Sequence, residues 1–149
     1  MSVYDAFELL PVGLFTRAIT FRTRLGTFEW RYAGRKERRG MGVDSGSVLV
    51  FERVVRVAVS GGKEEVLRTG VARLVRSEET RAVGSSPSSA GNGGRLLVDL
   101  GVWDEAAKME REMALVMVVT TCLAMLKKEI DRRRAQQMAV MMGAAGGGP

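Results

Sequence analysis

A basic cluster at residues 35–39 is the part of this chain whose side chains have the clearest chemical use. Four cations occur in five residues, with a glycine on either side: Arg35, Lys36, Arg38 and Arg39. Guanidinium groups offer paired N–H donors that match phosphate oxygens, so such a cluster can hold an anionic partner. A solvated surface loop is the alternative interpretation of the same residues.

Three arginines that precede the cluster are predicted to extend this cationic surface. Arg22, Arg24 and Arg31 lie in two alternating runs around Gly26, on the side away from the apolar residues. Residues 15–39 contain eight basic and two acidic side chains, which equals the net charge of +6 of the whole sequence. We therefore predict an anion-binding platform built from these arginines and the basic cluster. Arginines that simply face solvent on a sheet are the alternative.

The missing residue types bear on enzymatic function. The chain has no histidine, the commonest general base and zinc ligand, and its one cysteine, Cys122, lies in an apolar run where a thiol stays protonated. Neither a histidine-dependent catalytic group nor a Cys/His zinc site can be assembled. We predict a non-enzymatic protein with no cofactor and no metal. A single cysteine and the lack of a signal-peptide pattern favour the cytoplasm, with a membrane-peripheral or nuclear location as the alternative.

An uncharged apolar run at residues 113–126 constrains the fold most strongly. It follows acidic residues and precedes basic ones, which suits the dipole of a helix. A helix that is apolar all round must be buried on every side. Fourteen residues span only about 21 Å, less than a bilayer core of roughly 30 Å, so no transmembrane segment is expected. We predict a helix from an Asp104 N-cap to Gln137, enclosed by its own domain with Leu123 at the centre.

Alternating patterns predict antiparallel strands before this helix. A hairpin is expected around Gly26, followed by strands at 47–59, 64–76 and 95–100. Phe28, Trp30 and Tyr32 share one face and are interpreted as core rather than as nucleobase-stacking residues, so nucleic acid is not an expected partner. We expect a loose lead-in at 1–13, one domain at 14–137 and a disordered glycine-rich tail at 138–149. Within the domain we expect a polar connection at 33–46 and a flexible loop at 77–94.

Three segments together resemble the tubby C-terminal-like domain superfamily, which includes tubby proteins, LURP-one-related proteins and phospholipid scramblases. These segments are the hairpin ITFRTRLGTFEWRY (19–32), the strand SVLVFERVV (47–55) and the helix MALVMVVTTCLAMLKKEIDRRR (113–134). The resemblance also extends to small uncharacterised proteins with a similar arrangement. The resemblance implies an antiparallel barrel around a central apolar helix and, as in tubby proteins, basic surface residues that bind phosphoinositide head groups. No individual binding residue can be carried over from that family.

The predicted fold class is α+β, mostly β, with antiparallel strands that form a barrel or half-barrel around a buried apolar helix. The family barrel has about twelve strands and only six to eight are predicted here, so a half-barrel, or a barrel completed by a dimer, is expected. The leading functional hypothesis is a module that docks on anionic phospholipid or phosphoinositide head groups through the basic residues. The alternative is a protein-interaction or self-associating scaffold, with a partner chain or a homodimer.

Overall fold

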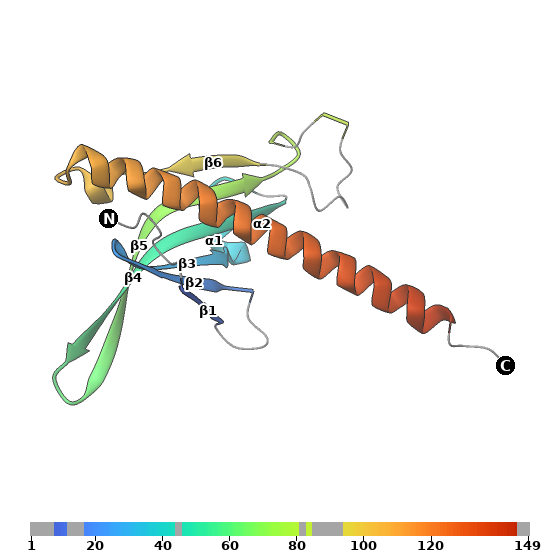
Figure 1. The fold of residues 1–149 in the computed structure, drawn as a ribbon, viewed down its shortest axis with the longest axis horizontal. Coiled ribbons are helices and arrows are strands. Elements are labelled where there is room, and N and C mark those ends of the chain that lie inside the picture. Colours follow the sequence, from blue (N-terminus) through green and yellow to red (C-terminus); the bar gives the residue numbers. More distant parts are fainter. Residues whose placement is uncertain (1–7, 12–16, 44–45, 81–82, 85–93, 146–149) are drawn as a thin grey trace, which may run out of the picture.

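The computed structural model describes residues 8–11, 17–43, 46–80, 83–84 and 94–145. These residues form six strands, two α-helices and one 3-10 turn (Figure 1). The elements are β1 (Glu8–Pro11), β2 (Ile19–Thr23), β3 (Gly26–Tyr32), α1 (Arg35–Gly40), β4 (Ser47–Val59), β5 (Lys63–Arg76), β6 (Arg95–Val98), η1 (Gly101–Trp103) and α2 (Lys108–Ala145).

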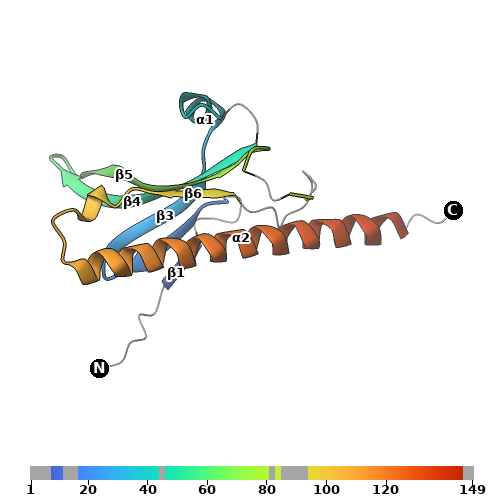
Figure 2. The same cartoon turned by 90° about the horizontal axis from the view of Figure 1, so that it is seen from above.

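The strands form one antiparallel sheet in which each strand pairs with the next in the sequence. β2 and β3 pair from Ile19 opposite Trp30 to Thr23 opposite Gly26, as expected for a hairpin that turns at Gly26. The β4–β5 hairpin is the longest, and its tip extends beyond the rest of the sheet (Figure 1). The sheet curves into a half-barrel, and α2 runs along one of its faces while α1 lies on the other (Figure 2). The predicted fold class is thus confirmed.

The core lies between the sheet and one face of α2. The rings of Phe28 and Phe51 stack with centroids 5.3 Å apart, and those of Trp30 and Phe51 with centroids 4.7 Å apart. The helix contributes buried residues at intervals of three and four, which place them on one side of a helix; they are Ala114, Met117, Val118, Thr121, Cys122 and Met125. Strand alternation therefore provides one apolar surface and helical periodicity provides the other.

One hydrogen bond fixes how α2 sits on the sheet. Trp30 Nε1–H donates to Thr121 Oγ1 over 2.9 Å, and that hydroxyl in turn donates to the Met117 carbonyl over 2.8 Å. All three residues are buried. Because a buried indole N–H that lacks an acceptor is costly, this bond favours one rotation of the helix over its neighbours.

The predicted enclosure of the apolar run on every side is wrong for the single chain. The side chains of Val116 and Leu123 are 63% and 61% exposed, so Leu123 is not at the centre of the core, where Val118 lies instead. The physical reason is that the described strands cover only one side of α2 (Figure 2).

The bounds of α2 also differ from those predicted. The chain first makes the 3-10 turn η1, which buries Trp103, and α2 begins at Lys108 rather than after Asp104. At its other end α2 continues past Gln137 to Ala145, because alanine, glutamine and methionine are strong helix formers. The expected tail at 138–149 is therefore helical up to Ala145. The loop expected at 77–94 lies mostly outside the described residues.

Two further segments have more structure than predicted. Residues 8–11, within the expected lead-in, form the edge strand β1, and the expected connection at 33–46 contains the helix α1. In the part of the chain that the structure describes, no helix is both long enough and apolar enough to cross a bilayer.

We predict that Thr121→Val lowers the free energy of unfolding by about 1–3 kcal/mol, because it leaves the buried Trp30 N–H without an acceptor. Urea denaturation measures this change. Thr69→Val makes the same substitution at an exposed position of β5 and should change stability by less than about 0.5 kcal/mol. Equal effects of the two substitutions would contradict the assigned rotation of α2.

Candidate functional site

The basic cluster lies on the helix α1 rather than on a loop. Glu37 caps this helix, since its carboxylate accepts the Gly34 N–H over 3.3 Å. Just beyond the helix, Met41 and Val43 pack against a small buried group of Ala33, Val48 and Val50. This packing holds α1 on the face of the sheet opposite α2 (Figure 2). Arg35, Lys36 and Arg39 are exposed there, and Arg38 is half-buried.

Arg31 ties α1 to the sheet by ion pairs with two carboxylates. Its guanidinium lies 2.8 Å from Glu37 of α1 and 2.7 Å from Glu52 of β4. Hydrogen bonds to Glu37 and then Glu52 raise the pKa of Arg31, and the bond from Arg31 lowers the pKa of Glu37. The charge of Arg31 is thus already balanced within the protein.

The same face of the sheet carries more such pairs. Arg68 lies 2.7 Å from Glu29 and 3.0 Å from Glu52. Burial alone would raise the pKa of Glu52, but the hydrogen bonds from Arg31 and Arg68 outweigh it and lower the pKa. The strand surface beside Arg31, predicted as part of a cationic platform, is therefore a network of opposite charges.

The structure does not bring the seven predicted arginines and lysines together. Arg22 pairs with Thr27 near the start of β3, and Arg24 lies in the turn that joins β2 to β3. Since α1 follows the other end of β3, these two residues lie about a strand length away from the basic cluster. Among the predicted residues, only Arg31 and Arg38 line a cleft between β3, α1 and α2.

An arginine-lined cleft of about 540 Å³ lies between the end of β3, α1 and the second half of α2. Among the described residues that line it, there are four arginines and one carboxylate: Arg17, Arg31, Arg38, Arg133 and Glu129. We call this the arginine cleft. Arg17 and Arg133 were not in the predicted site. The i,i+4 spacing of Glu129 and Arg133 predicts an ion pair between them, but no sequence pattern predicts that Arg133 lies near α1.

Two of these arginines are held by uncharged groups. Arg38 donates a hydrogen bond to the Gly46 carbonyl, and the Arg17 guanidinium lies 5.5 Å from the centre of the Tyr32 ring, within cation–π range. Neither forms an ion pair with any carboxylate in the described part of the chain. Among the described residues, no carboxylate therefore neutralises these two positive charges.

Glu129 anchors the other side of the cleft. It is only 6% exposed and forms ion pairs with Arg132 at 2.8 Å and Arg133 at 3.1 Å. Burial alone would raise the pKa of Glu129, but hydrogen bonds from these two arginines outweigh it and lower the pKa to about 2. Glu129 thus stays ionised and positions Arg133 at the cleft.

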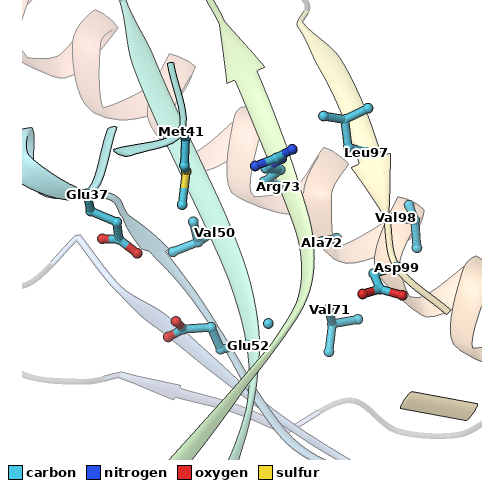
Figure 3. Close-up of a pocket in the computed structure, with 11 residues that line it drawn as sticks. Glu37, Met41, Val50, Glu52, Val71, Ala72, Arg73, Leu97, Val98 and Asp99 are labelled. Atoms are coloured by element: carbon cyan, nitrogen blue, oxygen red, sulfur yellow. The ribbon is translucent and has the colours of Figure 1, made fainter. Parts of the chain in front are cut away.

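A second cleft, of about 500 Å³, is less suited to a charged ligand. Figure 3 shows Glu37 and Glu52 on one side of it and Leu97, Val98 and Asp99 on the other. Its carboxylates already have partners, because Glu37 and Glu52 bind Arg31 and Asp99 accepts the Gly101 N–H over 2.9 Å. Nor does any group of three metal-ligating side chains occur among the described residues.

In comparisons with protein-family models, curated proteins and solved structures, nothing matches this chain. The resemblance to the tubby-like superfamily therefore stays a prediction.

We predict that Glu129 makes stability depend on pH in the acidic range. Because its folded pKa of about 2 lies below the ordinary value, its stabilisation is complete above about pH 4.5 and is lost as pH falls from there to about 2. The fall of the pKa of Glu129 from 4.5 to about 2 corresponds to a loss of roughly 3 kcal/mol. Denaturant unfolding at several pH values should show a shallower decline for Glu129→Gln than for the wild type.

The control for this experiment is Glu105→Gln, which removes the same charge from an exposed position. Its pH profile should follow that of the wild type. If Glu129→Gln declined as steeply as the wild type over this range, the ion pairs of Glu129 would not be present in solution.

Proposed function

We propose that this protein is a non-enzymatic module that binds a phosphate-bearing anion in the arginine cleft. The observation that carries this proposal is the convergence of four arginines, among the described lining residues, on a cleft with one carboxylate. Two of them, Arg17 and Arg38, are the important ones, because neither is paired with a carboxylate in the described part of the chain. A ligand phosphate would supply the missing negative charge.

The two arginines are held in place before any ligand arrives. Stacking over Tyr32 restricts Arg17, and the bond to the Gly46 carbonyl restricts Arg38. Gly46 has φ of +91°, and a Cβ at this position would collide with the Arg76 carbonyl oxygen, so glycine is needed for the close approach that presents its carbonyl. Binding then costs little side-chain entropy, which favours affinity.

We propose an anionic phospholipid head group as the source of the phosphate. The support for it is the position of Arg38 on α1, next to the exposed side chains of Arg35, Lys36 and Arg39. Cations that lie near an anionic membrane surface contribute about 1 kcal/mol each, and salt screens that contribution. These three residues would add general attraction, while the cleft would hold one phosphate specifically.

Several features support binding rather than catalysis. The chain has no histidine to act as a general base. Cys122 is buried, and burial raises the pKa of its thiol to about 11, so it is protonated at neutral pH. Glu129, the carboxylate at the cleft, is ionised and held by arginines, which leaves it a poor proton donor or acceptor near neutral pH.

We predict that Arg17→Gln/Arg38→Gln weakens binding to vesicles that carry a phosphoinositide by at least about tenfold, since it removes two charge-assisted contacts. Vesicle flotation measures this, with phosphatidylcholine vesicles as the neutral reference. The control variant Arg56→Gln/Lys63→Gln removes two charges from the exposed hairpin tip and should bind like the wild type. Binding should also weaken as salt concentration rises.

Calorimetry with a soluble inositol phosphate distinguishes the source of the anion. Heat of binding that is lost in Arg17→Gln/Arg38→Gln, together with flotation, supports the head-group proposal. Binding of the soluble ligand without any flotation would overturn the membrane source. Equal binding by the cleft variant and the hairpin control, or no binding of either ligand, would overturn the arginine cleft as the site.

A further inference from the structure

The face of α2 that points away from the sheet is apolar and uncovered in the single chain. Its exposed residues form a continuous surface over about three turns of the helix; they are Met113, Leu115, Val116, Val119 and Leu123. We call this surface the outer stripe. A folded protein rarely leaves such a surface exposed to water, so the outer stripe indicates a contact with another molecule.

Charged residues of opposite sign lie at the two ends of the outer stripe. Glu112 precedes Val116 by four residues, and Lys127 follows Leu123 by four residues, so each lies on the same side of the helix as its apolar neighbour. Both charged side chains are well exposed. The order along this side of α2 is thus negative, apolar, positive.

This order makes the outer stripe complementary to itself when a second copy runs in the opposite direction. We propose that two copies of this chain associate through the outer stripe, with their α2 helices antiparallel and a two-fold axis between Val119 and Thr120. Val116 then packs against Leu123 of the partner subunit, and Glu112 faces Lys127 of the partner subunit. The two-fold axis repeats both contacts, as in other isologous dimers.

The same register pairs further charges. Lys108, at the start of α2, comes opposite Asp131 of the partner subunit. Within one chain Lys108 lies 3.8 Å from Glu112, and Lys127 lies 2.5 Å from Asp131. The dimer joins these two exposed pairs into one cluster of alternating sign at each end of the stripe. Isolated surface pairs contribute little to stability, whereas a network with fixed geometry contributes more.

Charge complementarity favours this partner over the other arrangements. Parallel helices would place Glu112 beside Glu112 and Lys127 beside Lys127, which is repulsive. A bilayer is a poor cover because the stripe ends in charged residues at both ends within a short length of helix. A second copy, in contrast, satisfies the apolar residues and both charges together.

The dimer and the arginine cleft use different sides of α2. Glu129, which positions Arg133 at the cleft, follows Leu123 by six residues and lies about 120° round the helix from it, on the buried side. The proposed contact therefore does not use Glu129. This inference does not depend on the proposed binding of phosphate, and each can fail without the other.

Sedimentation velocity of the full chain over the micromolar range tests the proposal. The expected result is a dimer for the wild type. Glu112→Lys and Lys127→Glu should each raise the dimer dissociation constant by at least about tenfold, because each places like charges opposite one another twice. The double variant Glu112→Lys/Lys127→Glu restores opposite signs and should dimerise like the wild type.

Leu123→Lys provides a further test that does not rely on those charges. Because Leu123 is exposed in the single chain, the variant should stay folded by circular dichroism and sediment as a monomer. A wild type that remains monomeric throughout the range would overturn the proposal. Dimers that survive Leu123→Lys, or a double charge variant that fails to recover, would overturn the antiparallel contact through the outer stripe.

Discussion

The packing of one face of α2 on the aromatic face of the sheet is the contact on which the other features depend. The bond from Trp30 to Thr121 selects a single rotation of the helix, and Val118 fills the space beneath it. Because side chains on a helix keep fixed angles to one another, this rotation determines the direction in which every other side chain of α2 points. It turns Glu129 towards Tyr32 and the arginine cleft, and it turns Val116 and Leu123 outwards. A slip of the helix by one residue would rotate its side chains by about 100° and move Glu129 away from the buried side.

Ion pairing, rather than the number of positive charges, distinguishes the arginines on this side of the molecule. Arg31 belongs to a patch with abundant positive charge, yet Glu37 and Glu52 neutralise it and make it a structural link between α1 and β4. Arg17 and Arg38 are held by a ring and a carbonyl, and neither forms an ion pair with a carboxylate in the ranges that the structure describes. Net charge alone therefore indicates that an anion is a plausible partner, and only the arrangement of carboxylates indicates where it would bind.

Much of the fold could be predicted because it depends on local patterns. Alternation in residues 19–32 and the glycine at position 26 determine the β2–β3 hairpin, and the order of strands followed by one helix gave the correct fold class. The exposed side of α2 could not be predicted, because a segment that is apolar all round carries no signal of which side its domain covers. The cleft was also missed, since Arg17, Arg38 and Arg133 meet only through tertiary packing. The alternating pattern predicted that Arg31 is exposed on a strand. It could not predict the ion pairs of Arg31 with Glu37 and Glu52, which depend on the packing of α1 on the sheet.

The reactivity of cysteines at two neighbouring positions of α2 tests the central claim, that the domain covers one side of this helix and leaves the other open. Cys122 is 5% exposed, whereas Leu123, the next residue, is mostly exposed. We expect native Cys122 to react with a maleimide at least about a hundredfold more slowly than in the unfolded chain. Leu123→Cys in a Cys122→Ser background should react rapidly in dilute protein. Slow reaction at both positions would mean that the domain encloses the helix, and rapid reaction at both would mean that α2 does not pack on the sheet.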